Sequence, residues 1–380
     1  MKTVGIICEY NPFHLGHRRQ LELVRQTLGE DTAIVCVMSG NYVQRGEPAR
    51  WDKFTRARAA LACGADVVLE LPLTCALRSA EGFARGGVEI LTRFGAEVLS
   101  FGAECGDGEL LMELARRTES AEFAEKLRMG LDTGLSYAAA RQTALGQGSE
   151  VLSQPNNILG LEYCRAILTL GSGLEPLAIR RTGEYHAAEA DARAPSATAV
   201  RALHPEGSWR QYVPREAAEI LDGAPWYDLA FGERAVLARL RALSDGEWER
   251  CAHGSEGLWS KAMKAVRSQP DLESILQTIK SKRYPRTRLQ RLLLCAYLGI
   301  LQTDLEQPVP YVRILAVTQR GRPLLRRARD LGALPLVNPG QTPPDRDYYA
   351  LERRAADLYT LFAAPGRPTP AAQEQSARLF

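Results

Sequence analysis

The stretch EYNPFHLGHRRQ, residues 9–20, directly follows the apolar run Val4–Cys8. An apolar run of this length is typical of a buried strand, and His17–Leu28 shows the apolar spacing of a helix. An Asn-Pro pair ends the strand, and Gly16 allows the backbone to approach a ligand closely where the helix starts. The stretch therefore predicts a strand-to-helix junction that carries two histidines.

The first hundred residues repeat this alternation. Short apolar runs occur at Val4–Cys8, Ala33–Met38, Ala65–Leu71 and Ala96–Phe101, and helical patterns lie between them at His17–Leu28, Trp51–Cys63 and Ala80–Phe94. Strands that are apolar throughout and separated by helices predict a parallel sheet covered on both faces. Such sheets bind ligands at the carboxyl ends of their strands, which is where residues 9–20 are expected.

The rest of the chain contains fewer strand patterns. Residues 107–150 and 153–170 are helical in pattern, and Leu177–Arg181 is one more candidate strand. From about Tyr212 the pattern stays helical, apart from candidate strands at Val312–Val317 and Leu334–Val337 around a helix at Gly321–Asp330. We therefore predict an α/β fold in two parts. A Rossmann-like domain with a parallel sheet covers residues 1–210, and a mainly helical region covers residues 211–380.

Composition narrows the class of protein. The chain has 380 residues, a net charge of +3 and eight scattered cysteines without a C-x-x-C pair. Reduced thiols and the absence of a secretory signal favour the cytoplasm. No run approaches the roughly 18 apolar residues of a transmembrane helix, so no membrane contact is expected. Nothing in the sequence implies a protein partner, and nucleic-acid binding would need a local basic patch.

His14 and His17 lie one helical turn apart, so both rings can face one point above the strand ends. A helix N-terminus at this point favours a phosphate. Two imidazoles there can donate hydrogen bonds to oxygens that gain charge when a nucleophile attacks the α-phosphate of a nucleotide. The alternative is a pair of polar side chains that only decorate a loop. No Cys, Asp or further His is spaced to complete a metal site, so no metal ligand is predicted.

The segment SATAVR, residues 196–201, is the candidate partner of the histidines. Ser196 and Thr198 offer hydroxyls at a helix start, and Arg201 offers a cation for phosphate oxygens. Taken alone the segment is weak evidence, because Ser-x-Thr is also a common helix cap. Together with the histidines it predicts a catalytic group of His14, His17, Ser196, Thr198 and Arg201.

These patterns resemble the nucleotidyltransferase superfamily with the HIGH-type signature, and they imply a nucleotidyltransferase domain in the first part of the chain. Over roughly residues 1–335 the chain is similar to one family, the bacterial tRNA-methionine cytidine acetate ligases. The motifs that carry the similarity are GIICEYNPFHLGH, SGNYVQRGEPARWDKFTRARAALACGADVVLELP, SFGAE, SQPNNILGLEY, SATAVR, KSKRYPRTRLQR and VRILAVTQRGRPLL. Cys8 and Ala103 depart from the family pattern at peripheral positions.

The resemblance implies an enzyme that activates acetate with ATP to acetyl-adenylate and releases pyrophosphate. The acetyl group then passes to N4 of the wobble cytidine of elongator tRNA-Met, and AMP is released. ATP, magnesium bridging its phosphates, acetate and tRNA are the implied cofactors and partners, although spacing alone allows any small carboxylate. Two alternatives remain open: a small-molecule adenylyltransferase of cofactor metabolism, and a non-catalytic RNA-binding protein with a degenerate nucleotide pocket.

The candidate ATP-binding residues lie at three strand ends and one helix start. Of the two adjacent asparagines one could simply cap a helix, and of two adjacent arginines on a strand only one can face the ligand. The candidates are Ile7, Cys8, Glu9, Tyr10, Asn11, Pro12, Phe13, Gly16, Gln20, Gly102, Asn156, Asn157, Arg180 and Arg181.

The loop Ser39–Arg50 is polar and glycine-containing, and loops of this length in compact domains are commonly functional. Gln44, Arg45 and Glu47 are therefore candidates for the acetate or cytidine pocket, with a solvated surface loop as the alternative. Lys53 and Arg56 on the following helix are further candidates to face the phosphates.

The segment KSKRYPRTRLQR, residues 280–291, is strongly basic. Between residues 277 and 330 there are twelve Lys or Arg against three Asp or Glu. Clustered cations beside Tyr284 suit an RNA backbone and one stacked base, whereas a solvated helix face is the alternative. Five of its six cations are candidate RNA contacts, namely Lys280, Lys282, Arg283, Arg286 and Arg288. Arg291 is the sixth cation of the segment.

Overall fold

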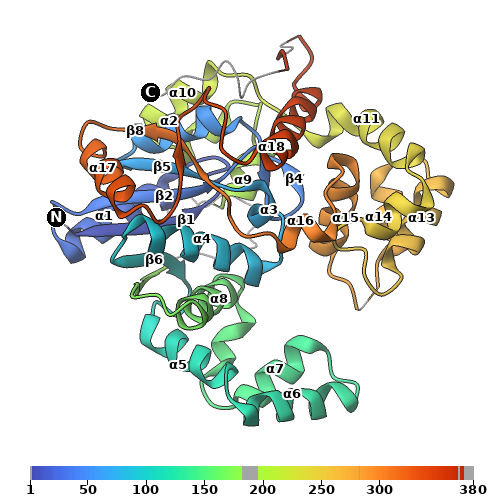
Figure 1. Ribbon diagram of the computed structural model, residues 1–380, viewed down its shortest axis with the longest axis horizontal. Helices are drawn as coiled ribbons and strands as arrows, with labels where there is room; N and C mark the ends of the chain where they lie inside the picture. Colours follow the sequence, from blue (N-terminus) through green and yellow to red (C-terminus); the bar gives the residue numbers. More distant parts are fainter. Residues whose placement is uncertain (1, 182–195, 282, 367–368, 372–380) are drawn as a thin grey trace.

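The computed structural model describes residues 2–181, 196–281, 283–366 and 369–371. A seven-stranded sheet lies at its centre (Figure 1). In spatial order the strands are β7 (Glu175–Arg180), β6 (Val98–Ala103), β1 (Thr3–Cys8), β2 (Ala33–Ser39), β5 (Val67–Leu71), β8 (Val312–Val317) and β9 (Leu336–Val337). All seven predicted apolar runs form strands within a few residues of the expected positions, which confirms the α/β class.

The strands of the sheet run parallel except at one place. β1 and β2 are parallel, with Thr3 paired to Ala33, but β8 runs antiparallel to β5, with Val67 paired to Val317. The five central-sheet strands from residues 1–210 are all parallel, as predicted, and β8, from the second half of the chain, is the exception. Val312–Val317 is fully buried, as are the mutually parallel strands β1, β2 and β5, and an apolar run carries no information about strand direction.

Helices cover both faces of the sheet, as predicted (Figure 1). Alternate strand residues point to opposite faces, so β1 places Ile6 in one core cluster and Ile7 in the other. The Ile6 face is covered by α1 (Leu15–Leu28), α2 (Lys53–Ala62) and α10 (Arg215–Asp222). The Ile7 face is covered by α4 (Ala80–Phe94), α5 (Gly108–Thr118), α8 (Pro155–Thr169) and α17 (Arg322–Leu331).

A second body of helices packs around its own apolar core beside the sheet (Figure 1). It comprises α11 (Leu229–Ala242), α12 (Asp245–Arg250), α13 (Leu258–Ser268), α14 (Leu272–Ile279), α15 (Arg286–Leu298), α16 (Gln302–Glu306) and α18 (Arg346–Tyr359). Tyr42, Leu73 and Leu77 from the first part of the chain belong to the same core. Because β8 and β9 also join the central sheet, the two halves are interleaved in space, and the division at residues 210/211 stays a prediction.

The remaining elements connect these layers or extend from them. They are β3 (Tyr42–Val43), β4 (Glu47–Pro48), α3 (Leu73–Ala76), α6 (Ala121–Asp132), α7 (Tyr137–Leu145), η1 (Ser149–Ser153), α9 (Ala197–Ala202), η2 (Ser208–Tyr212) and η3 (Thr360–Phe362). β3 and β4 form an antiparallel hairpin beside the carboxyl ends of the central strands. Within the described ranges, no helix has both the length and the apolar character needed to cross a membrane.

Candidate active site

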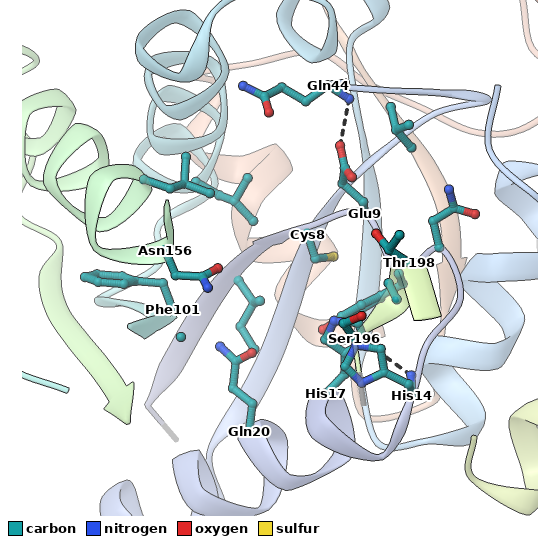
Figure 2. Close-up of a pocket in the computed structure, with 18 of the residues that line it drawn as sticks. Cys8, Glu9, His14, His17, Gln20, Gln44, Phe101, Asn156, Ser196 and Thr198 are labelled. Atoms are coloured by element: carbon teal, nitrogen blue, oxygen red, sulfur yellow. Dashed lines mark hydrogen bonds between the residues drawn. The ribbon is translucent and has the colours of Figure 1, made fainter. Parts of the chain in front are cut away.

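A cavity of about 220 Å³ lies at the carboxyl ends of β1 and β6. Figure 2 shows His14, His17, Ser196 and Thr198 on one side of it and Phe101 and Asn156 on the other. The predicted residues that line it are Ile7, Cys8, Glu9, Tyr10, Asn11, His14, His17, Gln20, Gln44, Arg45, Gly102, Asn156, Arg181, Ser196, Thr198 and Arg201. The fold thus brings together segments that are up to 190 residues apart in the sequence.

The two histidine rings stack at the start of α1, with centroids 3.7 Å apart and an interplanar angle of 21°. His14 caps the helix, because the Gly16 N–H donates to His14 Nδ1 at 3.1 Å. The His14 N–H in turn donates to His17 Nδ1 at 3.2 Å. A neutral imidazole that accepts at Nδ1 carries its hydrogen on Nε2. Each ring therefore has an Nε2–H donor.

Both histidines are held in the neutral state. Burial lowers the pKa of His14 to about 3, and the positive charges of Arg181 and Arg201 act in the same direction. Burial lowers the pKa of His17 well below its ordinary value too, followed by the effects of His14 and Arg181. Neutral donors stabilise a developing oxyanion without having to lose or gain a proton.

Arg201 lies at the end of α9 and reaches back to the histidine segment. Its Nη1 donates to the Asn11 carbonyl at 2.6 Å, and its Nη2 donates to Thr198 Oγ1 at 3.3 Å. Ser196 caps α9, since its Oγ accepts from the Ala199 N–H at 3.1 Å, and it also lines the cavity. The residue that caps α9 is therefore also part of the cavity lining.

Glu9 is held at the end of β1 by the β3–β4 hairpin. The Gln44 N–H donates to Glu9 Oε1 at 2.7 Å, the contact drawn as a dashed line in Figure 2. Burial raises the pKa of the Glu9 carboxyl, while the Gln44 N–H and the cations Arg201, Arg56 and Arg45 lower it. Among the described residues that line the cavity, Glu9 is the one carboxylate.

The structure separates the two ambiguous pairs. Asn156 lines the cavity and donates to Glu104 Oε1 at 2.6 Å, whereas the buried Asn157 accepts from the Cys105 N–H and donates to the Val151 carbonyl. Arg181 lines the cavity, whereas Arg180 donates to the Cys105 carbonyl at 2.8 Å. Of each pair, only one residue can contact a ligand in this cavity.

The family model described as HIGH Nucleotidyl Transferase matches residues 1–375 of the chain. A tRNA(Met) cytidine acetate ligase of Acetivibrio thermocellus is 34% identical over 366 residues, covering 89% of this chain and 88% of its own. One from Halothermothrix orenii is 35% identical over 367 residues, covering 89% and 87%. This chain belongs to the tRNA(Met) cytidine acetate ligase family of HIGH nucleotidyl transferases.

Solved structures agree with the assignment to this ligase family. The apo crystal structure of Thermotoga maritima TmcAL, 31% identical, superimposes with a TM-score of 0.90 and covers 100% of this chain and 99% of its own. The structure of the same protein bound with alpha-thio ATP has a TM-score of 0.88 with the same coverage. The similarity extends over the helical half, which a small-molecule adenylyltransferase would not need, so that alternative is not favoured.

Six predicted residues do not line the cavity of this ligase-family protein: Pro12, Phe13, Gly16, Glu47, Asn157 and Arg180. Phe13 is buried against Tyr10, with ring centroids 4.7 Å apart, and Gly16 acts through its N–H on His14. Glu47 accepts from Gln290 Nε2 at 2.9 Å, on the side of α15. These side chains shape the surroundings of the cavity.

The expectation that Lys53 and Arg56 face phosphates is wrong. Lys53 is 3% exposed and its Nζ lies 2.7 and 2.8 Å from the two Glu70 carboxylate oxygens. Arg56 is fully buried and donates to the carbonyls of Trp51 at 2.9 Å and Ser39 at 3.0 Å. Both cations are used inside the fold, because burial requires partners for them.

Sequence reasoning missed several apolar residues of the cavity, namely Ile6, Val43, Phe83, Phe101, Leu159, Tyr163 and Ala197. For two of these a signal existed. Leu159 and Tyr163 lie three and seven residues after Asn156, which is the spacing of one helix face. An apolar wall opposite the histidines suits the face of a nucleobase.

The basic segment lies at the start of α15, away from the cavity lining. Arg283 is paired with Glu256 at 2.9 Å and Arg286 with Glu273 at 2.9 Å, and all four side chains are exposed. Arg288 stacks over Tyr284, with the guanidinium 4.8 Å from the ring centroid. Lys280 is exposed, and Lys282 lies outside the described residues. Arg291, the sixth cation of the segment, is 7% exposed and faces the hairpin.

Proposed function

We propose that this chain is an ATP-dependent ligase that acetylates N4 of the wobble cytidine of elongator tRNA-Met. The observation that carries the proposal is the stacked pair of neutral His14 and His17, which shares one cavity with Arg201 at the carboxyl ends of β1 and β6. The similarity to tRNA(Met) cytidine acetate ligases over nine-tenths of the chain supports the same substrate.

In the first step an acetate oxygen attacks the α-phosphorus of ATP, and the bond to the pyrophosphate oxygen breaks. The Nε2–H groups of His14 and His17 donate to the α-phosphate oxygens as negative charge builds on them. Arg201 and Arg181 stabilise the charge of the leaving pyrophosphate. Ser196 and Thr198 offer hydroxyls to the same phosphates, and Gln44 and Arg45 on the hairpin face the acetate side.

In the second step the cytidine N4 amine attacks the acetyl carbonyl carbon. The new N–C bond forms, the bond from that carbon to the phosphate oxygen breaks, AMP leaves, and one N4 proton is lost. The protein contributes chiefly by holding the adenylate and the amine in reactive geometry.

Magnesium fits this cavity as an ion carried by the nucleotide. Among the described residues, no group of three or more His, Cys, Asp or Glu side chains is arranged to hold a metal. Glu9 and the hydroxyls of Ser196 and Thr198 are oxygen ligands of the kind that Mg²⁺ accepts beside phosphates and water. When bound, the ion would neutralise phosphate charge.

The basic start of α15, with Lys280, Arg283, Arg286 and Arg288, is the proposed contact for the tRNA backbone. Tyr284 is only 9% exposed and packs in the helical core, with the Arg283 and Arg288 guanidinium groups against its ring, so the base stacking expected at this residue is not part of the proposal. A tRNA substrate, together with eight free cysteines, fits a protein of the cytoplasm.

The direct test incubates the protein with ATP, labelled acetate and bulk tRNA, followed by mass analysis of the tRNA nucleosides. Labelled N4-acetylcytidine in elongator tRNA-Met is the expected product, and ATP–pyrophosphate exchange without tRNA should require acetate. A His14→Ala variant serves as the inactive control. Exchange that ignores acetate, or tRNA that stays unlabelled, would contradict the proposal.

A further inference from the structure

The β3–β4 hairpin, residues 42–48, separates the cavity from helix α15. On the cavity side, the Gln44 N–H donates to Glu9, and Gln44 and Arg45 line the cavity. Residues of the hairpin therefore form one wall of the proposed acetate site. The position of this wall therefore depends on the contacts that hold the other side of the hairpin.

The other side of the hairpin is held by two neighbouring residues of α15. Arg291 Nη1 donates to the Gln44 carbonyl at 3.1 Å, and Gln290 Nε2 donates to Glu47 Oε1 at 2.9 Å. Gln44 is thus fixed twice, through its N–H to β1 and through its carbonyl to α15. The Arg291 side chain is almost fully buried, so its contact is shielded from water.

Backbone contact reinforces these hydrogen bonds. Gly46, at the tip of the hairpin, has a φ of +81°, and a Cβ there would lie 2.6 Å from the Arg291 backbone nitrogen. Only glycine allows the hairpin to approach α15 so closely. The two ends of the hairpin are tied to the C-terminal helix, since Tyr42 donates to the Ala355 carbonyl at 2.9 Å and Tyr359 donates to the Ala49 carbonyl at 2.8 Å.

We propose that Arg291 and Gln290 are positioning residues for adenylate formation: they hold the hairpin so that Gln44 and Arg45 face ATP and acetate. The inference rests on the proposed function. It assigns a task in the tRNA-independent half-reaction to a helix whose first turn carries proposed tRNA contacts. A displacement of about 1 Å in a positioning element can cost up to 10²-fold in rate.

The test compares Arg291 of α15 with Arg354 of α18, another arginine that donates to backbone carbonyls, in its case at the C-terminal end of α15. Arg291→Met removes the donor to Gln44, whereas Arg354→Met removes donors to the carbonyls of Leu298 and Gly299. In the full-length protein without tRNA, Arg291→Met should slow acetate-dependent ATP–pyrophosphate exchange by about 10- to 10²-fold. Arg354→Met should exchange at the wild-type rate, and Arg291→Lys should recover part of the loss, because an ammonium keeps N–H donors but lacks the planar guanidinium geometry.

A milder variant guards against failure of Arg291→Met to fold. Gln290 is only partly buried, so Gln290→Ala should fold and slow exchange by about 3- to 10-fold, the effect of one hydrogen bond. Wild-type exchange rates in Gln290→Ala and in folded Arg291→Met would overturn the positioning role. Absence of acetate-dependent exchange in the wild type would instead overturn the proposed function. In that case the dissociation constant of ATP would be measured for both variants. Equal values in Arg291→Met and Arg354→Met would overturn the positioning role as well.

Discussion

Two clusters of ionisable side chains lie side by side near the carboxyl ends of the central strands, and they serve opposite purposes. In the cavity, His14, His17 and Arg201 surround a space of about 220 Å³. In the second cluster, Lys53 and Glu70 enclose a space of only about 20 Å³, with Glu352 beside them. The first cluster has room for a ligand, and the second has room for hardly more than a water molecule.

The second cluster is closed by its own contacts. Lys53 contacts both oxygens of Glu70, Arg313 Nε lies 3.3 Å from Glu70, and Arg313 Nη2 lies 3.5 Å from Glu352. Tyr311 donates to Glu352 at 2.6 Å. These groups join α2, β5, β8 and α18. Buried charge alone therefore does not mark an active site; charge directed at an open cavity does.

Breaking the closed cluster should have the largest effect, and the effect should be on stability. Lys53→Met leaves the Glu70 carboxylate in a buried position with Arg313 as its remaining partner. We expect the free energy of unfolding to fall by about 3–5 kcal/mol, measured by urea denaturation. Adding Glu70→Gln should recover part of this loss, because both charges are then removed. Turnover per folded molecule should stay within about threefold of the wild type, and a larger loss would mean that this cluster also serves the reaction.

Breaking the open cluster should affect turnover instead. His14→Ala and His17→Ala should each lower the turnover of adenylate formation by about 10²–10³-fold, the effect of removing one transition-state donor. Stability should change by only about 1 kcal/mol, the value of a helix cap for His14. Near-normal turnover in either variant would remove that histidine from the catalytic group.

Within the open cluster, Arg201 should separate the two half-reactions. Arg201→Ala should slow adenylate formation by about 10- to 10²-fold, because a charge-assisted hydrogen bond to the leaving pyrophosphate is lost. Transfer from preformed acetyl-adenylate to tRNA involves no pyrophosphate and should be nearly unchanged. Arg201→Lys should recover part of the rate, since it lacks the planar pair of donors. Single-turnover kinetics measures each step, and equal slowing of both would indicate a structural arginine.

The closed cluster should also respond to pH. Burial, followed by the repulsion of Glu70, raises the pKa of Glu352 from 4.5 to about 7. Because the folded-state pKa lies above the unfolded value, the stability contributed by this group is complete below pH 4.5 and is lost as the pH rises to about 7. The change should be on the order of 3 kcal/mol, at about 1.4 kcal/mol for each pKa unit.

A difference measurement isolates this contribution of Glu352. Histidines with lowered pKa values, such as His14 and His204, add to the stability of the protein as the pH rises through the same range. The total free energy of unfolding can therefore hide the effect of Glu352. The wild-type stability minus that of Glu352→Gln should therefore be compared at pH 5 and pH 7.5, and it should be smaller at pH 7.5. Equal differences at the two pH values would show that Glu352 is ionised throughout.

The smallest effect concerns the exposed basic segment, which contrasts with both buried clusters. Arg283→Ala with Arg286→Ala should weaken tRNA binding and lower the slope of log affinity against log salt by at most about 1.8. The change in slope should be smaller than this limit, because each arginine must first break its ion pair with a glutamate before it contacts a phosphate. The ion-paired Arg210 and Arg215 provide a control of equal charge on another surface. An unchanged salt slope would exclude this segment from the tRNA contact.

Local patterns were sufficient to predict the fold class and the histidine pair that lines the cavity. Strand Val312–Val317 and helix Ala80–Phe94 were predicted at their observed bounds, since burial in a sheet and the helical period act on neighbouring residues. His14 and His17 were predicted as partners for the same reason, because their contact spans one helical turn. The direction of β8 was not predictable, since it depends on the end of the sheet at which the chain enters this strand after the preceding helices.

Which cations serve the cavity could not be predicted from residue type. The sequence contexts of four cations are compatible with phosphate binding, namely Arg181, Arg201, Lys53 and Arg56. Only the first two line the cavity, because Lys53 is paired with Glu70 and Arg56 donates to backbone carbonyls. Arg291 belonged to a basic run and turned out to be buried against the hairpin. The partners of these side chains are set by packing between distant segments.

The sequence by itself determined the strand-to-helix junction that presents His14 and His17, because the apolar pattern is local and the hydrogen bonds that cap the helix lie within residues 14–17. Only the tertiary structure decided that Arg201 joins them from 190 residues away, and that Gln290 and Arg291 hold the hairpin from more than 240 residues away. Short-range order follows from propensity and capping, which act along the chain. Long-range contacts follow from the mutual packing of cores that no local pattern encodes.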